Sequence, residues 1–130
     1  MQPIPTRKVP AMSKVNIAEK FAKIPDFENP RIAAELNGQL VKFVKLNSDF
    51  VFHHHENEDE LFLVVKGRLR MDFLDRHEWV EEGEFIVVPR RVEHRPVAEQ
   101  ECWIILFEPA STVNTGNIEN AKTVRELERV

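Results

Sequence analysis

The sequence predicts an all-β protein, and three observations support this. Short apolar-rich runs recur at intervals of about ten residues between residues 31 and 108. Turn residues separate these runs, and Asn37-Gly38 marks a tight hairpin because both residues tolerate positive φ. The strand-like runs do not alternate with segments of helical periodicity, so a sandwich or barrel is expected and not a parallel α/β sheet.

The side-chain pattern of each run indicates how its strand is buried. Leu69, Met71 and Phe73 alternate with polar residues, which is typical of a strand with one buried face. The runs ELFLVV and CWIILF are apolar on both faces, so a helix or a second subunit is expected to cover their outer sides. The remaining expected strands lie in residues 31–46, 49–55, 79–80 and 84–88.

Two short helices are expected outside the strands. Asn16 can cap a helix that ends before Pro25. Ile17, Phe21 and Ile24 then share one face, which predicts packing across a sheet. The C-terminal run TVRELERV can form a second helix.

Length and composition indicate one globular domain. The chain has 130 residues, of which 42% are hydrophobic and 31% charged, with a net charge of −4 that argues against a general nucleic-acid binder. We expect residues 1–14 to form a flexible arm, in which Met12 can be the natural start, and residues 15–130 to form the domain. Cys102 is the single cysteine, and no run is long and apolar enough to span a membrane. The first residues do not resemble a secretory signal, so a cytoplasmic protein that meets neither membrane nor nucleic acid is expected.

The residues that indicate chemistry are the histidines of the HHHENEDE segment and one later histidine. Side chains alternate along a strand, so His53 and His55 project to one side and His54 to the other. Imidazoles at this spacing can share one metal ion. Glu60, after a short turn, and His94, on a later strand, can supply two more ligand atoms.

These residues also have simpler interpretations. The three adjacent histidines can form a solvated loop, and His94 alone can be a hydrogen-bonded structural residue. The other acidic residues of the segment fit a water-facing turn, and His77 is expected to be exposed. Cys102 lies in an apolar run and is expected to be a buried small hydrophobe and not a nucleophile.

The segment from 47 to 98 resembles the cupin family. The first cupin motif, G-x5-H-x-H-x3 or x4-E-x6-G, is matched from Asn47 to Gly67, and the second, G-x5-P-x-G-x2-H-x3-N, from Gly83 to Ala98. Asn47, Arg91 and Ala98 depart from the motifs. The four positions that hold metal in the family correspond to His53, His55, Glu60 and His94.

The resemblance implies a fold, a cofactor and an assembly. Cupins have a six- to eight-stranded jelly-roll β-barrel, also called a double-stranded β-helix, with the metal inside. Small stand-alone bacterial cupins, sometimes described as mannose-6-phosphate-isomerase-like, are similar to this sequence and are commonly dimers, so a homodimer is expected. Nitrogen and oxygen ligands without thiolate suit one divalent ion of Fe, Mn, Ni, Co or Zn.

Two functions fit such a site. One is a metal-dependent enzyme on a small polar molecule, as a dioxygenase or as an isomerase, epimerase or lyase. The other is a metal-loaded binding or sensor protein without turnover, because no general base or nucleophile stands out beyond the ligands. Arg90, Arg91 and Arg95 flank His94 and would favour an anionic ligand if they surrounded the barrel mouth, although a solvated basic turn also fits them. Candidate pocket-wall residues, which fit an ordinary core better, are Phe43, Phe62, Trp103 and Phe107.

Overall fold

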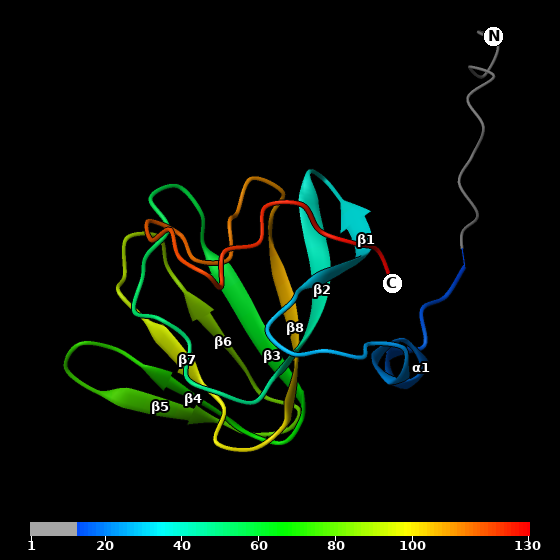
Figure 1. Ribbon diagram of the computed structural model, residues 1–130, viewed down its shortest axis with the longest axis horizontal. Helices are drawn as coiled ribbons and strands as arrows, with labels where there is room; N and C mark the ends of the chain where they lie inside the picture. The colour runs from blue at the N-terminus through cyan, green and yellow to red at the C-terminus, as the bar shows by residue number, and fades with distance from the viewer. Residues whose placement is uncertain (1–12) are drawn as a thin grey trace, which may run out of the picture.

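A computed structural model describes residues 13–130, and in it eight strands form two antiparallel sheets (Figure 1). The strands and the one helix of this part of the chain are α1 (Ile17–Ala22), β1 (Arg31–Leu36), β2 (Gln39–Leu46), β3 (Glu60–Lys66), β4 (Leu69–Asp72), β5 (His77–Val80), β6 (Phe85–Val88), β7 (Arg95–Val97) and β8 (Cys102–Pro109). The predicted all-β fold is confirmed.

The two sheets enclose one apolar core. The larger sheet has the strand order β1-β2-β8-β3-β6 and the smaller the order β5-β4-β7. Inward-facing residues of both sheets form one cluster, in which Leu69 and Met71 of β4 lie with Val64 of β3 and Ile104 of β8, all fully buried. The strand alternation predicted around Leu69 and Met71 is therefore confirmed, and the arrangement is that of a jelly roll.

The first hairpin follows from local backbone preference. Asn37 and Gly38 have φ values of 51° and 74°, and the residues that flank them, Leu36 and Gln39, are paired across β1 and β2. Asparagine and glycine accept this left-handed conformation at low cost, which confirms the predicted turn and fixes the register of β2.

The helix α1 covers one end of the outer face of the larger sheet. The Asn16 side chain caps it by accepting a hydrogen bond from the backbone N–H of Glu19 at 2.9 Å. The Phe21 ring stacks between Phe43 and Trp103, with centroid distances of 4.8 and 5.0 Å. Packing across the sheet is confirmed, but Ile17 is 41% exposed and does not share the buried face.

The predicted C-terminal helix is wrong. The tail lies beside the edge strand β1, where the Ile32 N–H donates to the Glu128 carbonyl at 2.9 Å and the Val130 N–H donates to the Ile32 carbonyl at 3.0 Å. An edge strand offers unpaired backbone groups, and pairing with them satisfies the tail better than an isolated helical turn would.

The predicted arm falls largely on residues 1–12, which lie outside the described residues. None of the helices described is long and apolar enough to cross a membrane.

Candidate metal centre

Two histidines that lie far apart in the sequence meet through their backbones. The His53 N–H donates to the His94 carbonyl at 3.0 Å, and the His94 N–H donates to the His53 carbonyl at 2.9 Å. This pair directs both imidazoles into the interior. His55 follows two residues later on the same side, and Glu60 opens β3 beside them.

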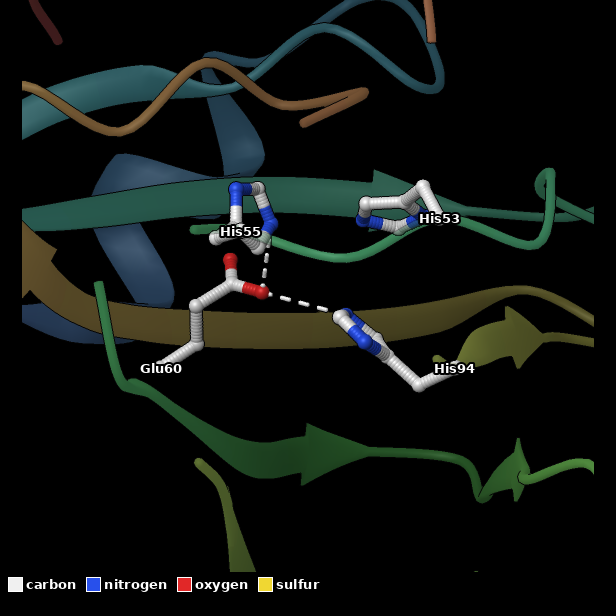
Figure 2. A group of neighbouring side chains, drawn as sticks. All are labelled: His53, His55, Glu60 and His94. Atoms are coloured by element: carbon white, nitrogen blue, oxygen red, sulfur yellow. Dashed lines mark hydrogen bonds and ion pairs between the residues drawn. The ribbon is translucent and has the colours of Figure 1, made fainter. Parts of the chain in front are cut away.

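The four side chains converge in the interior (Figure 2). The Glu60 Oε1 atom lies 2.8 Å from His55 Nε2 and 3.1 Å from His94 Nε2. One ligand atom from each of the four residues falls within 4.8 Å of all the others, and none of the residues is more than 4% exposed. The structure therefore brings together the whole predicted ligand set, which forms a buried cluster able to hold a metal ion.

His54 points away from this cluster, as strand alternation predicts. Its Nδ1 atom lies 2.5 Å from Glu93 Oε1 and its Nε2 atom lies 3.2 Å from Glu56 Oε2. The hydrogen bond with Glu93 and the nearby negative charges raise the pKa of this imidazole. His54 thus belongs to a surface ion-pair group and not to the ligand set.

Backbone carbonyls fix the orientation of two of the rings. The Nδ1 atom of His53 lies 2.8 Å from the Val51 carbonyl, and that of His94 lies 2.8 Å from the Val92 carbonyl. If each Nδ1 carries the proton and donates it there, each Nε2 is left with a lone pair for the cluster. The sequence carries no signal for these contacts, because a carbonyl precedes every histidine by two residues and only the fold turns the rings toward the Val51 and Val92 carbonyls.

The donor set fits a divalent cation. Both ring nitrogens of His55 are buried without a hydrogen-bond partner, although Nε2 lies only 2.8 Å from Glu60 Oε1. The contact is close but poorly aligned for a hydrogen bond. Two ligand atoms that bind one ion at a right angle, each about 2.1 Å from it, would be about 3.0 Å apart. The distances from Glu60 to both histidines match this spacing.

The local electrostatics hold two of the ligands, His53 and Glu60, in the protonation states that bind metal. Burial, together with the nearby His94, lowers the pKa of His53 to about 4, so that this imidazole is neutral at physiological pH. Burial by itself raises the pKa of Glu60, but its close contacts with Glu108, His55 and His94 hold that pKa well below its usual range. A neutral imidazole and an ionised carboxylate are the forms that coordinate metal.

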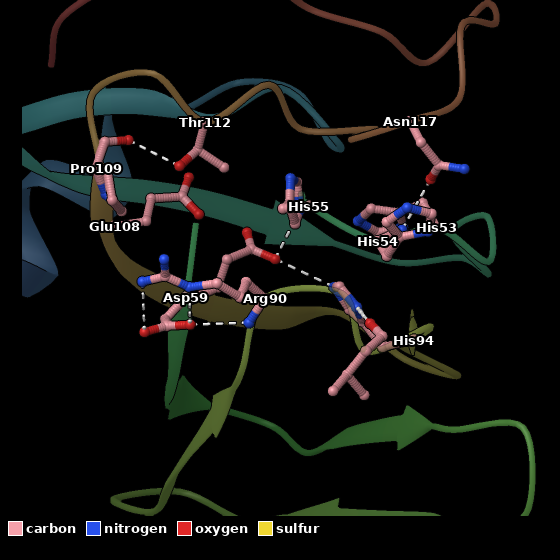
Figure 3. Close-up of polar contacts among 12 residues, drawn as sticks. His53, His54, His55, Asp59, Arg90, His94, Glu108, Pro109, Thr112 and Asn117 are labelled. Carbon is pink, nitrogen blue, oxygen red and sulfur yellow. Dashed lines mark hydrogen bonds and ion pairs between the residues drawn. The ribbon is translucent and has the colours of Figure 1, made fainter. Parts of the chain in front are cut away.

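A buried ion pair that was not predicted from the sequence lies beside the cluster. Lys42 Nζ lies 2.7 Å from Glu108 Oε1, and the two residues are 2% and 1% exposed. Glu108 points from β8 toward the cluster (Figure 3), and burial and the nearby charge of Glu60 raise its pKa well above the usual range. In the sequence, this ion pair is indicated only by a charged residue at an inward-facing position of an otherwise apolar strand.

A cavity adjoins the cluster, and its wall includes His53, Glu60 and Glu108. Of the predicted wall aromatics only Phe62 lines it. Phe43 and Trp103 pack under α1, and the Phe107 side chain is only half-buried.

The three arginines near His94 do not line this cavity. Arg90 pairs with Asp59 at 3.3 Å (Figure 3), Arg91 lies 3.6 Å from Glu56, and Arg95 pairs with Asp72 at 2.8 Å. Each of the three faces a carboxylate instead, and an anionic ligand stays a prediction. Within this cavity, an anionic ligand draws no support from them.

The departures from the cupin motifs have clear structural outcomes. Arg91 has φ of 69°, so the turn does require the left-handed conformation that glycine would adopt most easily. Its N–H donates to the His55 carbonyl at 2.7 Å, which joins this turn to the ligand segment. Ala98 is 1% exposed and packs in the main core together with Cys102, which is fully buried as predicted.

Comparison with known proteins gives one consistent family. A family model described as "Cupin domain" matches residues 42–105. A cupin-2 domain containing protein from Shewanella frigidimarina is 39% identical, with a TM-score of 0.72 over 73% of this chain and 93% of that protein. Protein NMB1881 from Neisseria meningitidis is 33% identical, with a TM-score of 0.69 over 75% of this chain and 99% of that protein.

A curated relative, the uncharacterized protein YdbB of Bacillus subtilis, is 32% identical over 63 residues. The match covers 48% of this chain and 56% of that protein, so it spans little more than half of the relative's length. The finer likeness to mannose-6-phosphate-isomerase-like cupins stays a prediction.

Proposed function

Because this chain belongs to the cupin family, we propose that it binds one divalent transition-metal ion and acts with it on a small polar molecule. The ligands in this proposal are His53, His55, Glu60 and His94. The observation that carries it is the convergence of four buried ligand atoms within 4.8 Å, two of which are on a histidine and a carboxylate in close but misaligned contact.

The bound ion would supply Lewis-acid or redox chemistry at coordination positions that the protein leaves open. The chain's own residues prepare the site. The Val51 and Val92 carbonyls orient two imidazoles, and apolar side chains around the cavity limit access of water. The donors are nitrogen and oxygen without thiolate, which suits Fe, Mn, Ni, Co or Zn.

The reaction classes that fit are oxygen insertion by a dioxygenase and proton transfer by an isomerase, epimerase or lyase. A binding or sensor protein that holds the molecule unchanged is the alternative. We distinguish these by incubating metal-loaded protein with a panel of thiols, phenols, diketones and sugar acids. Oxygen uptake or a changed product identifies an enzyme, whereas a molecule that binds and is recovered unchanged identifies a binding protein.

The direct test of the metal proposal is elemental analysis of untagged protein after purification and after reconstitution with each candidate ion. We expect one ion per chain. A protein that retains no divalent ion under any of these conditions would contradict the proposal.

We also infer a homodimer, formed through the outer face of the larger sheet. On the edge strand β6, Phe85 is 55% and Val87 51% exposed. They pair with Leu63 and Leu61 of β3, which are themselves only half-buried. A contiguous apolar surface of this kind is costly in water, and a second copy of the same face would cover it.

A further inference from the structure

A groove on the outer face of the smaller sheet (Figure 1) is lined by guanidinium groups and aromatic rings. In β4, the residues that alternate with the core positions are Arg70 and Asp72, so their side chains project away from the interior. Trp79 pairs with Arg70, and His77 and Arg95 both pair with Asp72, so these cross-strand neighbours share that face. The groove, which we call the arginine groove, has a volume of about 500 Å³, in the range of small-molecule sites.

One carboxylate on this face fixes two of the guanidinium groups. Asp72 is 7% exposed and accepts hydrogen bonds from Arg70 Nε at 2.6 Å and from Arg95 Nη2 at 2.8 Å. The other carboxylate near Arg70, that of Glu99, is exposed and does not line the groove. The two cations are therefore ordered around a single lining carboxylate, and a guanidinium that is already ordered loses little freedom when it binds an anion.

Several nitrogen donors of the groove are left for a ligand. Arg76 uses Nη1 for its hydrogen bond with Glu78, and Arg95 uses Nε and Nη2 for Asp72. No hydrogen bond to a described residue occupies Arg76 Nη2 or Arg95 Nη1. The Arg76–Glu78 pair is exposed on both sides, and such pairs contribute little free energy, so an arriving anion can replace Glu78 at Arg76.

Aromatic rings adjoin these donors. The Arg95 guanidinium lies 4.6 Å from the centroid of the Phe52 ring, and that of Arg76 lies 4.9 Å from the centroid of the Phe73 ring. Trp79 lies on the same face and lines the groove with them. The wall beside the positive groups is thus apolar and aromatic, and a ring carried by the ligand can pack against it.

The arginine groove is separate from the metal cluster. Phe52 directly precedes His53 and Arg95 directly follows His94, but Phe52 and Arg95 line the groove while the two histidines point into the interior. An anion in the groove would therefore bind on the opposite side of this backbone from the cluster. The inference stands without the proposed metal chemistry.

We propose that the arginine groove binds a small molecule that carries an aromatic ring and an oxyanion, either a carboxylate or a phosphate. The oxyanion accepts hydrogen bonds from the unoccupied nitrogens of Arg76 and Arg95, whose planar guanidinium groups suit both oxyanions. The ring packs against the aromatic wall of the groove.

The test follows the indole N–H signals of the two tryptophans, Trp79 and Trp103, in ¹H–¹⁵N spectra of the full chain. Phenyl phosphate and benzoate are the probes and are titrated separately, so that they distinguish the two oxyanions. We expect at least one probe to shift the Trp79 signal saturably and to leave that of Trp103, which packs under α1, in place. The variant Trp79→Phe identifies the signal that belongs to the groove.

Two arginine variants test the role of the groove. Arg76→Gln removes a guanidinium from the lining, and we expect it to weaken binding of the probe by about tenfold or more. Arg90→Gln makes the same change in net charge at an exposed arginine that pairs with Asp59 outside the groove, and it should bind the probe unchanged.

Three outcomes would overturn the inference. The first is that neither probe moves the Trp79 signal saturably, which includes a probe that binds only at the metal cluster. The second is equally tight binding by benzyl alcohol, which has the ring without the charge. The third is an equal loss of binding in Arg76→Gln and Arg90→Gln, because net charge alone would then explain the effect.

Discussion

His53 and His94 exchange two backbone hydrogen bonds, of 3.0 and 2.9 Å, and their rings lie 4.3 Å apart between centroids. Because the backbone itself makes this contact, two ligand positions are fixed by the fold before any ion binds. Such preorganisation means that metal binding needs little ordering of the chain, and that loss of a ligand imidazole leaves the fold in place.

Removal of a single ligand should abolish metal binding. We expect His53→Ala, His55→Ala and His94→Ala each to weaken metal affinity by more than about 100-fold, since each loses a direct bond to the ion. The measurement is metal content after gel filtration, with circular dichroism to confirm the β fold. His54→Ala is the control, because this side chain faces Glu93 on the surface. Equal metal loss in the control would contradict the assignment by strand alternation.

The stability of the metal-free protein should fall as the pH is lowered from about 6.5 to 4. Burial lowers the pKa of His53 from 6.5 to about 4, so between these values the unfolded chain binds a proton that the folded chain does not. The free energy of unfolding then falls by up to about 1.4 kcal/mol per pH unit, or about 3 kcal/mol in all.

Denaturant unfolding in the presence of a chelator measures this dependence. The variant His53→Asn lacks the titrating group and should show a shallower slope over the same pH range. A metal-free protein whose stability is the same at pH 6.5 and pH 4 would be inconsistent with a neutral buried His53.

A side chain at Gly116 should disturb the ligand segment. A Cβ atom there would lie 2.2 Å from the His54 carbonyl oxygen and 3.1 Å from His53 Cδ2, and φ is +54°. We expect Gly116→Ala to lose about 3 kcal/mol or more of stability and to bind metal more weakly. Gly83→Ala is a matched control, with φ of +80° and nothing within 4 Å, and should cost only about 1–2 kcal/mol. Equal effects of the two variants would show that the close approach at Gly116 is unimportant.

Truncation of Phe21 should lower stability without changing the site. This side chain is fully buried and stacks between Phe43 and Trp103, so Phe21→Ala is expected to cost about 3–5 kcal/mol in denaturant unfolding. Metal content should be unchanged, because α1 lies on the outer face of the sheet. Leu74→Ala, at a residue 77% exposed, serves as control and should change stability by less than about 0.5 kcal/mol.

A charge on the exposed edge of the larger sheet should separate the proposed dimer. We expect Val87→Lys to shift the mass measured by light scattering from two chains to one, because burial of an unpaired charge at an interface is costly. Leu74→Lys, on an equally apolar but separate exposed residue, should leave the mass unchanged. A monomeric unmodified protein would refute the proposal directly.

Local patterns in the sequence were sufficient to predict much of the fold and the ligand set. The hairpin at Asn37-Gly38 depends on the φ preferences of two adjacent residues. Alternation predicted that His53 and His55 share one side, although the expected strand over 49–55 is reduced to single bridges at Asp49 and His53. Their grouping with Glu60 and His94 followed from motif spacing and family resemblance. The hairpin and the alternation are predictable because their causes lie within a few residues of one another, whereas the approach of His94 to His53 was expected only from the family resemblance.

Contacts between distant segments decided the rest. The Lys42–Glu108 pair joins residues 66 positions apart, and the arginine groove forms only because β4, β5 and β7 lie side by side. The tail pairs with β1 instead of forming a helix, because the strand offered it unpaired backbone groups. Periodicity shows on which side of a strand a side chain lies. It does not show which residue that side chain contacts, because the contact depends on how the two sheets pack around their shared interior.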